Sequence, residues 1–140
     1  LEDALDRSLS YIPADSDCAA AVKLARGLVG QTDGGISIRK HYPDMSVVHT
    51  VNNLALVVWA LLSHPDDFSA AIGDVVAAGL DTDCNGATVG ALWGLQDKTI
   101  PDFWSAPWGG NVGLSLAGTD TVNVAELIDR TVAVTVNLTV

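Results

Sequence analysis

The chain has 140 residues, a length that suits one domain. Hydrophobic residues make up 49% and charged residues only 17%, with a mean hydropathy of +0.31, so we expect part of its surface to be covered by another surface. A net charge of −10 with seven basic residues argues against nucleic-acid binding.

The longest apolar run, Leu54–Leu62, is well short of the ~20 residues that a membrane-spanning helix needs. Cys18 and Cys84 lie far apart in the sequence and indicate free thiols in a reducing compartment rather than a disulfide. We therefore expect a cytoplasmic protein that does not act at a membrane.

Apolar spacing and capping residues predict a largely helical chain. The expected helices cover residues 1–11, 15–29, 50–63, 66–78, 86–95 and 123–136. Pro13 ends the first helix and Pro65 separates the third from the fourth, since proline is poor inside a helix. Asp33-Gly34-Gly35 predicts a loop over residues 31–40, and prolines with paired glycines predict loops and turns over residues 96–113.

Asp81 and Asp83 stand two residues apart in a short polar segment before an apolar, glycine-spaced helix. Carboxylate oxygens are the ligands that hard cations such as Mg²⁺ prefer, and the following helix N-terminus suits an anion. A calcium loop fits the first positions, but Leu92 stands where such a loop needs a bidentate Glu. Simple capping of the helix is the other alternative.

Five segments in order resemble the ADP-ribosylglycohydrolase family, and most closely a bacterial branch whose metal motif carries a Cys after the second aspartate. These segments are residues 81–90 (DTDCNGATVG), 49–58 (HTVNNLALVV), 64–68 (HPDDF), 100–104 (IPDFW) and 116–118 (LAG). The resemblance implies an all-α protein, an orthogonal helical bundle. It also implies that the β-branched tail after Arg130, whose alternation is typical of a strand, starts as helix; we expect helix to about Val136.

The activity implied by the resemblance is hydrolysis of the bond between ADP-ribose and an acceptor, either a protein or a small molecule. Two Mg²⁺ ions, or Mn²⁺ in their place, would serve as cofactors. Asp81 and Asp83 would be catalytic metal ligands, the first on one ion and the second bridging both. Cys84 occupies a position where the family has a Thr or Ser ligand, and sulfur suits Mg²⁺ poorly. Water in its place, a softer metal or a weak second site are the alternatives.

The family's other metal ligands come from a Thr-Asp-Asp motif, which this sequence does not contain. We therefore expect residues 1–140 to be the C-terminal portion of one domain whose N-terminal half is absent, and the isolated chain to be inactive. The N-terminal half or a second copy would be the partner. The alternative function is a non-catalytic binding or structural protein, because crystallin-like members share the scaffold.

Two further groups of residues are candidates for substrate contacts. Asn85, Gly86 and Ala87 would offer backbone N–H groups, and His49, Asn52 and Asn53 share one side of the helix over residues 50–63. The second group has a structural alternative, with Thr50 as helix cap and the asparagines hydrogen-bonded in the core. Gly86, Gly90 and Gly94 lie on one helix face, which indicates close approach of a second helix or of a ligand.

Overall fold

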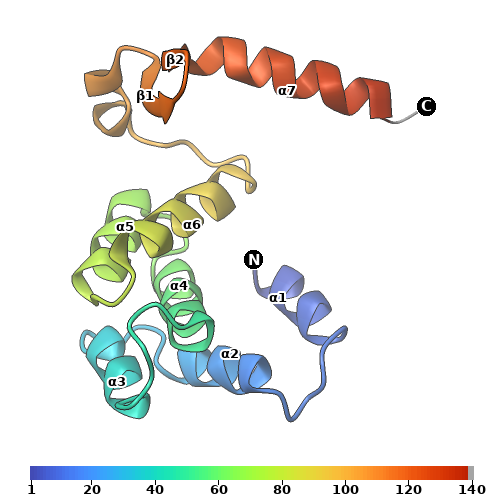
Figure 1. The fold of residues 1–140 in the computed structure, drawn as a ribbon. Helices are drawn as coiled ribbons and strands as arrows, with labels where there is room; N and C mark the ends of the chain where they lie inside the picture. Colours follow the sequence, from blue (N-terminus) through green and yellow to red (C-terminus); the bar gives the residue numbers. More distant parts are fainter. Residues whose placement is uncertain (139–140) are drawn as a thin grey trace. The chain divides into compact units, whose positions relative to one another are not determined.

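The computed structural model describes residues 1–138, and the last two residues lie outside this description. The chain divides into two compact units, Leu1–Thr99 and Ile100–Val140. The first unit is built of α-helices, and the second combines short helical turns, a two-stranded sheet and one long α-helix (Figure 1). The predicted all-α class is confirmed, with the small sheet as an addition that the sequence did not indicate.

Six α-helices form the first unit, and their order follows the chain (Figure 1). They are α1 (Glu2–Leu9), α2 (Asp17–Gly27), α3 (Gly34–His41), α4 (Thr50–Ser63), α5 (Phe68–Ala77) and α6 (Thr82–Gly94). Helix α4 is the centre of the unit, because α2, α3, α5 and α6 all pack against it. Its residues are apolar almost throughout and ten of its 14 residues are buried, as expected of a helix covered on all sides.

The loop predicted for residues 31–40 is wrong, because α3 occupies most of it. Gly34 and Gly35 begin this helix where its backbone passes close to Trp59 of α4. A Cβ at Gly34 would collide with the indole ring, and one at Gly35 would lie 2.7 Å from the Cβ of Ala78. The indole Nε1 also donates a hydrogen bond to the carbonyl of Leu28, at 3.1 Å. The glycines therefore serve close packing rather than chain reversal.

Gly34→Ala should lower the free energy of unfolding by about 1–3 kcal/mol, because the added methyl group forces the indole out of a packed position. Gly73→Ala in α5 is the matched control, since a Cβ there meets open space. It should stabilise the helix by about 0.5–1 kcal/mol through the higher helix propensity of alanine. Urea unfolding followed by circular dichroism measures both, and equal effects would contradict this explanation of Gly34.

The predicted helix over residues 50–63 is found with the same bounds, and the others shift at their ends. Ser16 caps α2 by accepting a hydrogen bond from the backbone N–H of Ala19, at 3.2 Å. Asp67 caps α5 in the same way, accepting from Ala70 at 2.9 Å. The largest shift is in α6, which begins at Thr82 rather than at Gly86. The aspartate segment therefore forms the first helical turn instead of a separate loop.

Helix α1 is held to α2 by charge rather than by burial, since none of its residues is buried. The guanidinium of Arg26 contacts the carboxylates of Glu2 and Asp6, at 2.8 and 2.7 Å. The hydrogen bond to Asp6 and the two negative charges raise the pKa of Arg26 against the opposing effect of desolvation. The apolar side of α1 therefore stays free to line a cavity.

The second unit begins with two 3-10 turns and continues with a hairpin and a helix. Its elements are η1 (Asp102–Trp104), η2 (Ala106–Trp108), β1 (Asn111–Leu116), β2 (Thr119–Asn123) and α7 (Val124–Leu138). The strands are antiparallel, with Val112 opposite Val122, and the turn contains Gly118 at a φ of +78°. None of residues 100–136, whose side chains are described here, is buried.

Helix α7 confirms the helix predicted to about Val136, because it continues through the β-branched tail to Leu138. Asn123 is its cap and accepts a hydrogen bond from the N–H of Glu126 at 3.2 Å. The rest of the expected strand-like tail, residues 139–140, lies outside the described residues. No helix in the described chain combines the length and the apolarity needed to cross a bilayer.

Candidate functional site

A tight turn between α5 and α6 sets the position of the aspartates. Gly79 and Leu80 both adopt left-handed backbone conformations, with φ of +83° and +63°. For a residue with a side chain such as Leu80 this conformation costs about 1–2 kcal/mol, so the surrounding contacts must hold it in place. Asp81 follows directly, as the residue at the N-terminal end of α6.

The side-chain amide of Asn53 is one contact that holds this turn in place. Its Oδ1 accepts hydrogen bonds from the backbone N–H of Asp81, at 3.2 Å, and from Nδ2 of Asn85, at 2.6 Å. Its Nδ2 donates to the backbone carbonyls of Val47 and His49, at 2.8 and 2.9 Å. Asn53 and Asn85 are both buried, so these bonds are shielded from water. Asn53 thus joins the start of α4 to the start of α6.

The other two polar residues at the start of α4 have structural bonds as well. His49 is the N-cap, one residue before the expected Thr50, and its Nδ1 accepts from the N–H of Val51 at 3.2 Å. Asn52 is 1% exposed and donates to the carbonyl of Ser46, at 3.0 Å. The predicted core hydrogen bonding of Asn52 and Asn53 is therefore present. A role of these three residues toward a substrate stays a prediction.

Asp81, Asp83 and Cys84 bring their ligand atoms together, all within 4.8 Å of one another. Asp81 is half-buried and the other two side chains are exposed. Although Asp81 occupies the N-cap position, its carboxylate makes no capping bond to α6. A hydrogen bond to that carboxylate raises the pKa of the Cys84 thiol, and the negative charges of Asp81 and Asp83 add to the effect. Capping alone therefore does not account for Asp81.

The remaining residues of this turn point in different directions. Asn85 is buried toward Asn53, and its backbone N–H donates to the carbonyl of Asp81 at 2.9 Å. Gly86 faces α5, where a Cβ would lie 3.4 Å from Val76, whereas Ala87 is exposed. A Cβ at Gly90 or Gly94 would meet no described atom within 4 Å. A Cβ at Gly86 would therefore make ordinary van der Waals contact, and packing among the described residues requires glycine at none of these three positions.

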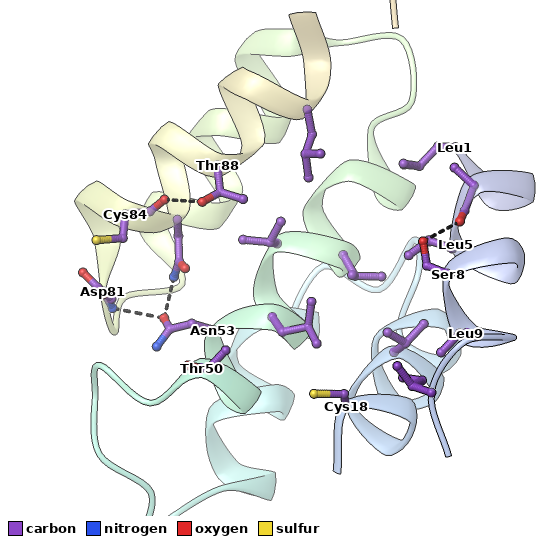
Figure 2. Close-up of a pocket in the computed structure, with 18 of the residues that line it drawn as sticks. Leu1, Leu5, Ser8, Leu9, Cys18, Thr50, Asn53, Asp81, Cys84 and Thr88 are labelled. Atoms are coloured by element: carbon purple, nitrogen blue, oxygen red, sulfur yellow. Dashed lines mark hydrogen bonds between the residues drawn. The ribbon is translucent and has the colours of Figure 1, made fainter. Parts of the chain in front are cut away.

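An apolar cavity of about 570 Å³ borders the cluster, and it was not predicted from the sequence. Its walls come from α1, α2, α4 and α6, with Leu1, Leu5 and Leu9 on one side (Figure 2). Asn53, Asp81, Cys84 and Thr88 supply polar atoms at its other side, as Figure 2 shows. Its volume lies within the range of small-molecule sites, about 300–1,000 Å³.

A comparison with known protein families shows to which family this chain belongs. The family described as ADP-ribosylglycohydrolase matches residues 1–135, nearly the whole chain. The chain belongs to this family. No curated protein and no solved structure matches it.

Members of this family are typically metal-dependent. The donor atoms at the start of α6 can therefore be compared with the ligands that divalent cations prefer. The two carboxylates fit a hard divalent cation, because Mg²⁺ and Mn²⁺ bind oxygen donors. The sulfur of Cys84 does not fit Mg²⁺, although its atom lies in the same group. The residues therefore fit a divalent cation in general, with one donor that disagrees with magnesium.

Asn53→Ala should loosen the start of α6, because the N–H of Asp81 and the amide of Asn85 lose a buried acceptor. We expect a loss of about 2–4 kcal/mol in the free energy of unfolding from the two unpaired donors. Hydrogen exchange at the Asp81 amide should become faster at the same time. Asn52→Ala is the matched control: it removes a buried amide that bonds to Ser46 and accepts a hydrogen bond from Asn53 Nδ2 at 3.2 Å, but it leaves both bonds of Asn53 Oδ1 to Asp81 and Asn85 in place, so exchange at Asp81 should stay slow. Faster exchange in both variants would contradict the role assigned to Asn53.

Proposed function

We propose that this chain is part of a metal-dependent hydrolase that cleaves ADP-ribosyl linkages, with Asp81 and Asp83 as its catalytic metal ligands. One observation carries the proposal: in a chain of the ADP-ribosylglycohydrolase family, the first turn of α6 places these two carboxylates within 4.8 Å of each other. The Asp81 carboxylate supports it further, because it makes no capping bond to α6 and its hydrogen-bond partner is the Cys84 thiol of the same cluster.

Each residue of the site has a proposed part. Asp81 would hold one ion and Asp83 would take part in holding both, with Mg²⁺ or Mn²⁺ as the cofactor expected from the family. When bound, such ions would supply Lewis-acid chemistry, either polarisation of the ribose or activation of a water. Asn53 positions the Asp81 backbone, and the adjacent cavity offers an apolar wall to the part of the substrate that enters it. Asn85, Gly86, Ala87, His49 and Asn52 are the proposed further substrate contacts.

Hydrolysis should depend unequally on the two aspartates, in a protein that carries this chain together with a Thr-Asp-Asp segment. Asp83→Asn removes a charge shared by two ions and should lower the rate by about a hundredfold or more, equal to roughly 3 kcal/mol of lost stabilisation. Asp81→Asn should cost less, because it serves one ion. Release of ADP-ribose from an ADP-ribosylated protein at fixed Mg²⁺ concentration measures both.

Asp33→Asn is the matched control for these variants. It removes an exposed carboxylate at the start of α3, the end of that helix that packs on Trp59, and should leave the rate unchanged. Full activity of Asp83→Asn would refute the binuclear site and favour the non-catalytic, crystallin-like alternative.

We also propose that a partner surface, either an N-terminal half with the remaining metal ligands or a second copy, covers apolar side chains that this chain exposes. The support comes from α7, where the rest of the second unit leaves the side chains of Leu127, Ile128 and Val132 exposed. Burial of apolar surface stabilises association by about 25 cal/mol per Å². Exposed side chains of this size therefore favour a covered state.

The chain alone should associate as its concentration rises, because apolar contact between copies removes this surface from water. Static light scattering over a concentration series should give a mass above that of the monomer, 14.5 kDa. The double substitution Ile128→Asp/Val132→Asp should shift the mass back toward the monomer. A monomer at all concentrations, without binding of a dye for hydrophobic surface, would rule out this proposal.

A further inference from the structure

We propose that Cys84 is itself a metal ligand, so that Asp81, Asp83 and Cys84 bind a thiophilic transition metal of the Zn²⁺ type in preference to Mg²⁺. This inference rests on the proposed function in one respect, namely that a cation binds between Asp81 and Asp83. It goes further in naming the chemical class of that cation and the residue that selects it.

The position of the sulfur carries the first step. Its atom belongs to the same group as the two carboxylates, with all three ligand atoms within 4.8 Å. Figure 2 shows the sulfur of Cys84 and the carboxylate of Asp81 on the same side of the first turn of α6. A cation bound by the carboxylates therefore meets the sulfur at once.

The second step is the match between donors and metal. Mg²⁺ requires near-octahedral oxygen ligands, and a thiolate satisfies it poorly. Zn²⁺ accepts sulfur at about 2.3 Å and carboxylate oxygen at about 2.0–2.2 Å, which in a tetrahedron places neighbouring ligand atoms about 3.5 Å apart. The ligand atoms already lie within 4.8 Å of one another, and the exposed side chains of Asp83 and Cys84 have room to rotate toward this spacing. Three protein ligands leave the fourth position open, as in catalytic zinc sites.

The third step concerns where else in the chain a metal could bind through sulfur. Among the described residues, this is the group in which three or more His, Cys, Asp or Glu donors converge. The other thiol, Cys18, lies in α2 and belongs to no such group in the described residues. A sulfur–metal signal from this chain can therefore be assigned by comparing the two cysteines.

Titration of the chain with Co²⁺, a spectroscopic substitute for Zn²⁺, tests the proposal without any measurement of activity. The wild-type chain and Cys18→Ser should develop the near-ultraviolet charge-transfer band that marks a cobalt–thiolate bond. Cys84→Ser should lack the band and bind Co²⁺ at least about tenfold more weakly. Loss of a residue that only hydrogen-bonds to a metal ligand already lowers metal affinity by about 10–100-fold, and loss of a ligand should cost no less. Zn²⁺ should displace Co²⁺ at equal concentration, whereas excess Mg²⁺ should not.

Several results would overturn the inference: no band in the wild type, a band that survives in Cys84→Ser, displacement of Co²⁺ by excess Mg²⁺, or no binding at millimolar Co²⁺. Because Cys84 is exposed, Cys84→Ser should keep the helical circular dichroism of the wild type. The outcome is separable from the proposed function. If the thiolate band appears but no assembly hydrolyses the substrate, the metal assignment stands and the hydrolase proposal is wrong. If hydrolysis depends on Mg²⁺ and the band is absent, the hydrolase proposal stands and the metal assignment is wrong.

Discussion

The buried amide of Asn53 is the constraint on which the candidate site depends. An amide has a donor end and an acceptor end, and here each end meets a different part of the chain. The donor end binds the loop that leads into α4, and the acceptor end binds the turn that leads into α6. Rotation of the amide would face donor to donor on one side and acceptor to acceptor on the other. A single orientation therefore fixes two helix starts against each other.

This arrangement also explains why a strained turn persists beside the aspartates. Leu80 holds a left-handed conformation that most residues with side chains avoid. The hydrogen bond from the next residue, Asp81, to Asn53 holds the chain in that conformation, and α4 beneath it is almost fully buried. The same bond fixes the backbone of Asp81 at the N-cap position of α6, where its carboxylate makes no capping bond to the first helical turn. The strained turn and the position of this carboxylate therefore both depend on Asn53.

What the sequence could predict follows from how local each signal is. The apolar run of α4 lies within that helix, and the caps Ser16 and Asp67 directly precede α2 and α5, so these elements were predictable. The start of α3 was not predictable, because its glycines are required by close contact with Trp59, which lies more than twenty residues away in the chain. The start of α6 was misplaced because Asp and Asn occur equally in turns and in first helical turns. The hairpin was missed because prolines and paired glycines predicted loop and turns up to residue 113, and no element was predicted between there and the last helix.

The candidate site divides in the same way. The aspartates and Cys84 were found because their spacing is short enough for one helical turn to bring them together. That Asn53 acts on this turn was not predictable, since its partner Asn85 lies 32 positions further along the chain. The cavity depends on four helices at once and has no local signature.

The negative charge of the chain limits how the proposed site could attract its substrate. The chain carries −10, and the two carboxylates of the cluster would repel the diphosphate of an ADP-ribosyl group. One divalent cation does no more than neutralise these two carboxylates, and a thiolate at Cys84 would restore one negative charge. The positive end of the α6 dipole, equivalent to roughly half an elementary charge, offsets only part of this. Attraction of an anionic substrate therefore requires positive charge beyond one ion, which is the electrostatic reason for a second cation or for ligands and basic groups supplied by the partner surface.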